Sequence, residues 1–551
     1  MHGRPGLGGA EDMSHLKTKC REINLKTLAA AERKIQATME DPELAHGTWQ
    51  KFIKDVEANR AGRPVGVDQV CLDDKLLVDT FGIWERHSGG AWKIRVINNF
   101  RANLVNDHAW MPSKLRYSGY GELRDASALL KKHLSGKLCL GKSDFRSAFK
   151  PLPPSESQTW LCWTLIFNPE VGKLQVAPFY SQAFGSVGAV VAWYRTATAL
   201  QTIMDRIFNL TAFIYVDDCF WACPDFEVQE SMPTARWQQE VFHEVASGLL
   251  GWELDPEKSE TGNTVTLLGL SITMESTHSE WRLDARKAEE WSQDIDRILQ
   301  ADTLYPSEAA KLAGRLAFLN SQIFNKLGRS LLRPIIWRQL QECGTVALTA
   351  RLRWSLRWFV RVLRESLCRA IRFNRPISER RAVIYSDAEG DGNIAGVLIS
   401  GSSMFYYMIR IPNSVRKRLR HRRTNIIAFE LIAAILSILV FVSRVEPEIH
   451  VRHYIDSTSA LRCIVRGFSK QNDLLAYTGM LWFEAAQTLS SYFACYVRSE
   501  LNLADAPSRG CATLMKQLGA MELSVDFPSW FHAADRWLMS PSEGRRLLMH
   551  E

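Results

Sequence analysis

The stretch Thr211-Ala-Phe-Ile-Tyr-Val-Asp-Asp-Cys-Phe-Trp-Ala222 decides the fold, because it places two adjacent carboxylates inside an otherwise apolar segment. The β-branched and aromatic residues on both sides predict two short buried strands joined at Asp217 and Asp218. Buried charges must be paired or must coordinate a metal, and the stretch contains no Lys or Arg. Hard oxygen ligands favour Mg²⁺ or Mn²⁺. A polar hairpin turn without any ligand fits this stretch equally well when it is taken alone.

The composition is that of an ordinary globular protein with several domains. The chain has 551 residues, of which 46% are hydrophobic and 23% charged, and this length predicts roughly three to four domains. The net charge of +8 is a modest excess, so the placement of the basic residues matters more than their sum. The 11 Cys residues are scattered and odd in number and lack the spacing of a zinc site. They predict free thiols in a reducing compartment.

Neither a secretory signal nor a membrane span is expected. The first six residues are polar, and no apolar segment follows them. The most apolar run, residues 426–442, is short for a membrane span and contains Glu430. We therefore predict a buried helix with one functional acid. We also expect a cytoplasmic or nuclear protein that is not secreted and has no membrane partner.

Two cations alternate with apolar residues in the segment 92–97. Lys93 and Arg95 are separated by Ile94, so both side chains project from one face of a predicted strand. Two cations on one face of a hairpin could hold a polyphosphate. The alternative is an ordinary solvated strand face.

Acidic residues recur at the ends of other apolar, strand-like segments. Asp144 follows the apolar segment that begins at Leu138, and Phe149 comes five residues later. An acid in this position is either a metal ligand or a helix N-cap. Four more acids follow in the last third of the chain: Asp387 and Asp456 at strand ends, Glu430 on the apolar helix, and Asp505.

The order of these motifs resembles the fingers and palm of a reverse transcriptase. Tyr-x-Asp-Asp alone is a weak signal, but its position among the other motifs is specific, and the resemblance covers roughly residues 77–275. The matching motifs are Lys93-Ile-Arg95, Asp144 with Phe149, Phe184-Gly185, Tyr215-Val-Asp-Asp218, Lys258 and Leu267-Leu-Gly-Leu270.

The later acids resemble the four carboxylates of a ribonuclease H domain, in the order of that family. The segment Asn502-Leu-Ala-Asp-Ala-Pro-Ser-Arg509 is similar to the closing motif of retroelement ribonuclease H domains. A polymerase followed by this nuclease resembles the Pol region of a retrotransposon of the LTR or DIRS-like sort. The two resemblances together cover residues 77–510.

The resemblance implies an α+β polymerase with palm, fingers and thumb, followed by an α/β ribonuclease H-like domain with a mixed sheet. The expected domains are a weakly ordered N-terminal extension (1–66), fingers and palm (67–275), a helical thumb or connection (276–375), the nuclease-like domain (376–515) and a C-terminal tail (516–551).

The resemblance also implies roles for the polymerase residues. Asp144 and Asp217 would be direct metal ligands, and Asp218 would support them. Lys93 and Arg95 would hold the incoming triphosphate, and Phe149 would exclude a ribose 2′-hydroxyl. The segment from Gln182 to Gly188, which includes Gly185, would pack against the template–nucleotide pair. Lys258 would be either a general acid or an exposed loop lysine.

For the nuclease, the resemblance implies that all four later acids bind metal and activate a water on the RNA strand. The expected cofactor is Mg²⁺ or Mn²⁺, with two ions in each active site. The expected partners are an RNA template, a DNA primer, the RNA–DNA hybrid and dNTPs, and the oligomeric state is not predicted. The basic run Arg416–Arg423 would contact the hybrid or serve as a nuclear-import patch.

Two features depart from the family pattern, and two other functions compete with this one. Phe184-Gly185 lacks the neighbouring prolines that family members often carry, and the late nuclease loop has no clearly placed His.

The alternative functions are a catalytically decayed nucleic-acid-binding scaffold of the same fold and an RNA-dependent RNA polymerase. Retention of all seven acids argues against the scaffold, and Phe149 with the nuclease motifs argues against the RNA polymerase.

Overall fold

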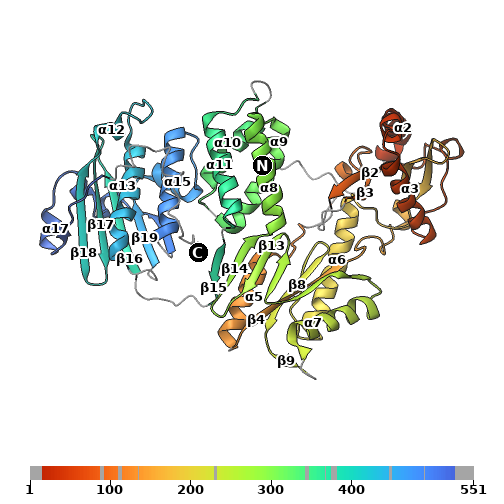
Figure 1. Ribbon diagram of the computed structural model, residues 1–551, viewed down its shortest axis with the longest axis horizontal. Coiled ribbons are helices and arrows are strands. Elements are labelled where there is room, and N and C mark those ends of the chain that lie inside the picture. The colour runs from red at the N-terminus through yellow and green to blue at the C-terminus, as the bar shows by residue number, and fades with distance from the viewer. Residues whose placement is uncertain are drawn as a thin grey trace. The chain divides into compact units, whose positions relative to one another are not determined.

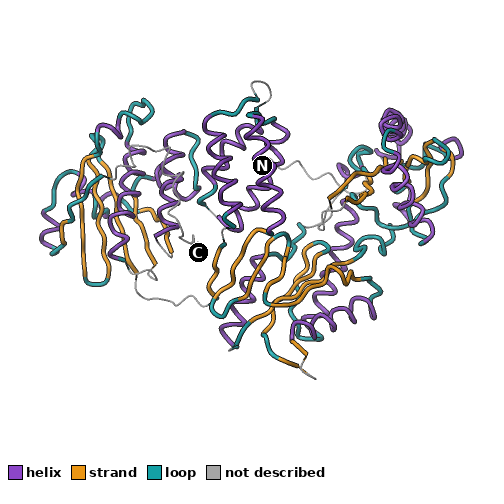
Figure 2. The backbone as a smooth tube through the Cα atoms, viewed as in Figure 1, coloured by secondary structure: helices purple, strands orange, loops and turns teal. Residues whose placement is uncertain are grey.

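The structure is a computed structural model of a mixed α/β protein with several sheets (Figures 1 and 2). The chain divides into two compact units. The first comprises Met1–Ala126 with Cys139–Gly262, and the second comprises Ser127–Leu138 with Asn263–Glu551. The structure describes residues 15–86, 92–109, 114–134, 136–228, 232–324, 326–341, 346–366, 368–373, 381–445, 450–488 and 491–527.

The first unit contains a five-stranded sheet in the order β1-β6-β5-β2-β3. β2 and β5 run parallel, and the other neighbours in the sheet are antiparallel. The strands are β1 (Val65–Gly66), β2 (Leu77–Arg86), β3 (Trp92–Asn98), β5 (Trp163–Asn168) and β6 (Lys173–Pro178).

Two N-terminal helices, α2 (Cys20–Met39) and α3 (Pro42–Glu57), pack against this sheet. Asp41 caps α3 by accepting a hydrogen bond from the Leu44 amide at 3.0 Å. Asn24 ties α2 to β2 because its side chain accepts from the Leu77 amide at 2.8 Å. The expectation of a weakly ordered extension over residues 1–66 is therefore wrong for residues 15–57, whose apolar helix faces complete the core of the first unit.

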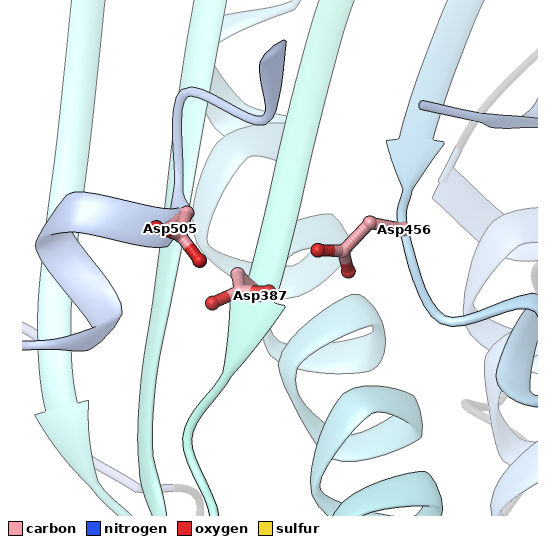
Figure 3. A group of neighbouring side chains, drawn as sticks. All are labelled: Asp387, Asp456 and Asp505. Carbon is pink, nitrogen blue, oxygen red and sulfur yellow. The ribbon is translucent and has the colours of Figure 1, made fainter. Parts of the chain in front are cut away.

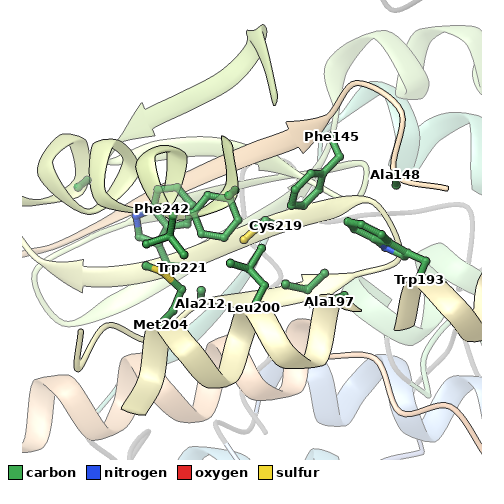
Figure 4. Packing of buried hydrophobic residues seen from close by; sticks show 14 of the residues in the cluster. Phe145, Ala148, Trp193, Ala197, Leu200, Met204, Ala212, Cys219, Trp221 and Phe242 are labelled. Atoms are coloured by element: carbon green, nitrogen blue, oxygen red, sulfur yellow. The ribbon is translucent and has the colours of Figure 1, made fainter. Parts of the chain in front are cut away.

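The second sheet of this unit has the order β11-β4-β8-β7. Its strands are β4 (Leu138–Phe145), β7 (Phe213–Tyr215), β8 (Asp218–Pro224) and β11 (Leu254–Gly262). α6 (Val187–Arg206) and α7 (Thr234–His243), which continues as the π-helical turn η4 (Glu244–Leu249), contribute to its core. Trp193, Trp221 and Phe242 are fully buried there (Figure 4). A Cβ at position 141 would lie 2.3 Å from the Trp221 ring, which explains the glycine in β4.

Shorter elements complete the first unit, together with α5, which continues into the second. They are η1 (Val67–Gln69), α4 (Val105–His108), α5 (Tyr120–His133), η2 (Glu156–Leu161) and the two-stranded pair β9 (Glu227–Val228) and β10 (Met232–Pro233).

The second unit begins with a four-stranded antiparallel sheet and a group of helices. The strands are β12 (Thr264–Leu267), β13 (Leu270–Met274), β14 (His278–Leu283) and β15 (Arg369–Arg372). The helices are α8 (Ala285–Ala301), α9 (Pro306–Leu319) with the π-helical turn η5 (Asn320–Phe324), α10 (Arg329–Gln339) and α11 (Ala350–Arg364). The segment 276–375, expected to be helical, therefore also supplies two strands.

A six-stranded mixed sheet follows in the same unit, in the order β20-β19-β16-β17-β18-β21. β16 is parallel to β19, β19 is parallel to β20, and β16, β17 and β18 form an antiparallel meander. The strands are β16 (Arg381–Ala388), β17 (Asn393–Ser400), β18 (Ser403–Arg410), β19 (His450–Ile455), β20 (Ser491–Tyr496) and β21 (Met521–Glu522). Because β21 belongs to the expected tail 516–551, part of that tail joins the sheet; residues 528–551 lie outside the described residues.

The helices of this last domain are divided between the two faces of the six-stranded sheet. On one face, Tyr407 of β18 donates a hydrogen bond to the Ala433 carbonyl of α13 (Ile426–Phe441) at 3.1 Å. On the same side lie α14 (Thr458–Arg466) and α15 (Asn472–Thr488). Among the described residues, the helices on the other face are α16 (Asp505–Ser508) and α17 (Thr513–Gln517). The short elements α12 (Asn413–Arg416), η6 (Val442–Arg444) and η7 (Ser499–Leu501) complete the domain.

α13 was predicted to be a buried helix, and the structure agrees. Within the described residues, the segment Ile426–Arg444 is long and apolar enough to cross a membrane by composition, but 67% of its most apolar window is buried inside the fold. A core helix that is covered on all sides has the same composition as a membrane span.

Candidate active sites

The first cluster of carboxylates lies where β4 meets the β7–β8 hairpin. Asp144 is near the end of β4, Asp217 is in the turn, and Asp218 begins β8. The Phe145 amide donates to the Asp217 carbonyl at 3.4 Å, which joins β4 to the turn. Val216 has φ of 55°, a left-handed conformation that is unusual for a β-branched residue. Trp193 holds the turn by donating its indole N–H to the Val216 carbonyl.

These three carboxylates repel one another. Burial, followed by the charge of Asp144, raises the pKa of Asp217, although the charges of Lys258 and Arg95 oppose this effect. Burial, followed by the charges of Asp217 and Asp144, raises the pKa of Asp218 to about 6. Acidic groups with raised pKa values that face one another favour a bound cation. The residues present therefore fit a divalent metal.

Lys258 supplies a positive charge to this cluster. It lies on β11, where its ammonium contacts Asp144 and lies 3.6 Å from Asp255. Burial would lower its pKa, but hydrogen bonds to Asp144 and Asp255 and their charges raise it above the ordinary value. Lys258 is exposed, as its alternative reading expected, but it is a strand residue rather than a loop residue, and its ammonium contacts Asp144.

The two predicted triphosphate-binding cations lie on one face of β3, as expected. Glu85 on the neighbouring strand β2 accepts from Arg95 at 2.7 Å and lies 3.2 Å from Lys93. Burial would raise the pKa of Glu85, but hydrogen bonds from both cations lower it. The Arg95 guanidinium also lies over the Phe184 ring, 4.5 Å from its centroid.

Of the other three predicted nucleotide-binding residues, Phe149 contacts the Phe184 ring, and Gln182 and Gly185 lie close to Phe184 along the chain. Phe149 is buried, with its ring edge-on to Phe184 at 5.9 Å between centroids. Gln182 donates its side-chain amide to the Pro153 carbonyl at 3.3 Å. Gly185 has φ of 108°, and a Cβ there would lie 2.4 Å from the Asn98 carbonyl, so the turn requires glycine.

Asn106, to which the sequence analysis gave no role, contacts the turn around Gly185. Its side chain donates to the Gly185 carbonyl at 2.8 Å and accepts from the Val187 amide at 2.9 Å. It therefore holds the turn that precedes α6 in place.

The second cluster of carboxylates lies at the C-terminal ends of the inner strands β16 and β19 of the six-stranded sheet (Figure 3). Asp387 is near the end of β16, Asp456 follows the parallel strand β19, and Asp505 begins α16. Each offers a carboxylate oxygen, and these oxygens all lie within 4.8 Å of one another. Because parallel neighbouring strands end at the same edge, the fold brings Asp387 and Asp456 together without special loops.

Glu430 completes this cluster from the first half of α13. It is only 4% exposed, and its Oε2 has no hydrogen-bond partner among the described residues. Burial, followed by the charges of Asp387 and Asp456, raises its pKa well above the ordinary value. A buried carboxylate oxygen without a partner, beside other acids, fits a divalent cation that would complete its coordination.

Three residues near this cluster had no individual role in the sequence analysis. Ser508 donates its hydroxyl to Asp387, and Asn502 donates to the Ser386 carbonyl at 3.1 Å. His453 is fully buried in β19 and shares a 2.8 Å hydrogen bond with the Ser386 hydroxyl. Ser508 and Asn502 belong to the quoted closing motif, whereas the signal for His453 is a polar residue inside an apolar strand.

The raised pKa of Asp387 predicts a pH dependence of stability in metal-free protein. Burial and the neighbouring acids Asp456 and Asp505 raise this pKa from 3.8 to about 7, against the lowering effect of Ser508. The folded state therefore binds the proton more tightly than the unfolded state does. The protonated Asp387 carboxyl therefore stabilises the fold fully below about pH 4, and this stabilisation is lost as the pH rises through about 7.

With EDTA present, we expect wild-type protein to lose roughly 2–4 kcal/mol more unfolding free energy between about pH 4 and pH 8 than Asp387→Asn loses. Denaturant unfolding of both proteins measures this difference. Equal losses in the two proteins would contradict it. Excess Mg²⁺ should remove most of the difference, because it stabilises the ionised wild-type site.

Comparisons with known proteins give distant likenesses to solved structures and nothing else. No protein-family model matches the chain, and no curated protein matches it. Among solved structures, the chain is similar to "Structure of the foamy viral protease-reverse transcriptase dRH in complex with ds DNA", with 16% identity and a TM-score of 0.45. This likeness covers 82% of this chain and 69% of that chain. A TM-score below 0.5 is too low to carry a functional assignment, so the function rests on the residues described above.

Proposed function

We propose that this chain is an RNA-directed DNA polymerase that also degrades the RNA strand of its RNA–DNA hybrid product. The observation that supports it is that each compact unit contains its own crowded carboxylate cluster. Copying RNA and then removing it requires two such sites. In this proposal, residues 67–275 act as fingers and palm, 276–375 as thumb and connection, and 376–515 as the ribonuclease H-like domain.

Both proposed reactions are in-line phosphoryl transfers. Divalent cations, Mg²⁺ or Mn²⁺ with two in each site, would neutralise the clustered charge, activate the attacking oxygen and stabilise the leaving group. In the first unit Asp144 and Asp217 would hold them, supported by Asp218. In the second, Asp387, Glu430, Asp456 and Asp505 would do so.

Residues of the first unit would bind and select the nucleotide. Lys93 and Arg95 would bind the triphosphate, which must compete with Glu85 for both cations. This competition favours a ligand with several negative charges. Phe149, supported by Phe184, would exclude the 2′-hydroxyl, and Lys258 would donate a proton to the leaving pyrophosphate.

Residues of the second unit would position the acids and the hybrid. Ser508 would fix the orientation of Asp387 through its hydroxyl. A hybrid is recognised by its backbone shape and 2′-hydroxyls rather than by its sequence. Lys417, Arg418, Arg420 and Arg423 of the basic run are exposed and would contact it. Arg422 has a different role, because it pairs with Asp473.

The test is primer extension on poly(rA)–oligo(dT) with Mg²⁺. We expect incorporation of dTTP and about a hundredfold less of UTP, since forcing an extra hydroxyl against a packed ring costs about 3 kcal/mol. Phe149→Ala should narrow this difference. Incorporation of neither nucleotide would favour the non-catalytic scaffold, and incorporation of UTP as well as dTTP would favour an RNA polymerase.

A further inference from the structure

Within the described residues, no helix covers one half of one face of the six-stranded sheet. Residues paired across neighbouring strands lie on the same face, so Val383, Arg452 and Phe493 share a face, as do Val397, Tyr385 and Tyr454. α16 and α17 cover this face over β17 and β18, where Ala504 and Met515 pack on Val397 and Tyr406. Over β19 and β20, Arg452 is exposed and Phe493 is 66% exposed. The helices α13, α14 and α15 lie on the opposite face.

This region, which we call the open sheet face, consists of the exposed Arg452 and Phe493 and the half-buried Tyr454 and Tyr385, and Tyr385 forms its border because it also packs against the cluster under α16 and α17. Tyr385 and Tyr454 stack on each other, with centroids 5.1 Å apart and an interplanar angle of 21°. Arg452 and Phe493 are direct cross-strand neighbours. Exposing an aromatic ring to water costs free energy. A ring beside a guanidinium can instead stack on a nucleic-acid base while the cation contacts a phosphate.

The open sheet face continues directly into the second carboxylate cluster. Asp387 comes two residues after Tyr385 on β16, and Asp456, the first residue after β19, comes two residues after Tyr454, so the carboxylates adjoin this face at the ends of the two strands. Two residues along a strand span ~7 Å. The open sheet face therefore extends from the carboxylates toward the N-terminal ends of β16 and β19. A nucleic acid bound at the carboxylates would have this aromatic and cationic surface next to it.

We propose that the open sheet face binds unpaired nucleotides that continue from the hybrid held at the carboxylate cluster. Bases would stack on Phe493 and on the Tyr454–Tyr385 pair, and Arg452 would contact a phosphate. This inference rests on the proposed nuclease function and adds a substrate feature to it, namely a single-stranded extension. The cation and the continuity with the carboxylates favour nucleic acid over a second protein as the occupant.

The experiment compares a blunt RNA–DNA hybrid, the same hybrid with a single-stranded RNA extension at either end, and the single strand alone. Binding is measured by fluorescence anisotropy with Ca²⁺ in place of Mg²⁺ to prevent cleavage. We expect the extension at one end to tighten binding about tenfold, because each base that stacks on an aromatic side chain adds to the binding free energy. Phe493→Ala and Arg452→Ala should each remove most of this gain.

Tyr496→Ala is the matched control. Tyr496 is a 52% exposed aromatic on the same edge strand, but its position places it on the opposite face from Phe493. The control should keep the full gain, and all three variants should unfold at the wild-type denaturant concentration because the replaced side chains are exposed. An equal loss in Tyr496→Ala, or a gain that survives in Phe493→Ala and Arg452→Ala, would overturn the proposal.

The remaining outcomes separate this inference from the proposed function. Phe493-dependent binding of the single strand, without binding of the blunt hybrid, would support the open sheet face and contradict the nuclease. Binding of the blunt hybrid with no gain in affinity from either extension would be consistent with the nuclease and would contradict nucleotide binding at the open sheet face. A change of sedimentation coefficient in Phe493→Ala without any change in nucleic-acid binding would make the face a protein interface and overturn the proposal.

Discussion

Replacing Asp217 with asparagine is expected to lower DNA synthesis by about a thousandfold or more, while cleavage of an RNA–DNA hybrid stays close to the wild-type rate. Asp217 lies in the turn that faces Asp144, and the change removes one of the two proposed direct metal ligands. The second carboxylate cluster belongs to the other compact unit, so its acids keep their geometry. Primer extension and cleavage of labelled hybrid, measured on the same preparation, test both halves of this prediction.

The loss should not come from unfolding. Burial and the neighbouring Asp144 already oppose the charge on Asp217, so a neutral amide relieves repulsion in metal-free protein. We therefore expect the unfolding free energy of the variant in EDTA to equal or exceed that of wild type. Loss of both activities, or of neither, would mean that the two clusters do not act as separate sites.

Asp255→Asn is the control for this prediction. Asp255 pairs with Asp144 across β11 and β4 and lies 3.6 Å from the Lys258 ammonium. It is thus a nearby carboxylate on the same sheet that shares a partner with the cluster. Synthesis by this variant should stay within about tenfold of wild type, because a partly exposed ion pair contributes little.

The apolar pattern of the sequence predicted the strands that position the carboxylates. The β7–β8 hairpin follows from Phe213-Ile214 and Cys219-Phe-Trp221, whose side chains are buried on both sides of the turn. Asp387 and Asp456 were likewise placed at strand ends by short apolar runs. Such local signals are strong because a one-residue shift would expose every buried side chain of the strand.

Contacts between distant segments were not predictable from the sequence. Lys258 contacts an acid 114 residues earlier, and Ser508 contacts one 121 residues earlier. No local pattern encodes such a pairing, because it depends on how strands are ordered in a sheet. The weakly ordered N-terminal extension was wrong for the same reason: the apolar residues of α3, such as Trp49 and Phe52, have their partners on strands far along the chain.

The open sheet face is the clearest case of a feature that depends on contacts between distant segments and cannot be predicted from the local sequence. Successive side chains of β20 (Ser491–Tyr496) point to opposite faces of the sheet, and this alternation follows from strand geometry alone. It does not say which face is covered, because that depends on where α16 and α17 pack, and they reach only β17 and β18. The exposure of Phe493 is therefore evident only in the structure.

Replacing Asp456 with asparagine is expected to give the opposite separation of activities. Hybrid cleavage should fall by about a thousandfold or more, and DNA synthesis should be unchanged, because Asp456 belongs to the proposed metal-binding set of the second unit. The wild-type protein should also gain thermal stability when Mg²⁺ is added, since the cation would relieve repulsion between Asp387, Glu430 and Asp456. In Asp456→Asn, most of the stability that Mg²⁺ adds through binding at this cluster should be lost.

Asp391→Asn is the matched control for the second cluster. Asp391 lies four residues after Asp387, but it is exposed and accepts a hydrogen bond from the Asn393 amide at 3.2 Å within its own turn. It should therefore keep both cleavage and the Mg²⁺ effect. If Asp456→Asn cleaves as fast as this control, then the three aspartates that the fold brings within 4.8 Å of one another do not form a nuclease site. If it stops cleaving but keeps the whole Mg²⁺ effect, Asp456 acts in the reaction without contributing to metal binding.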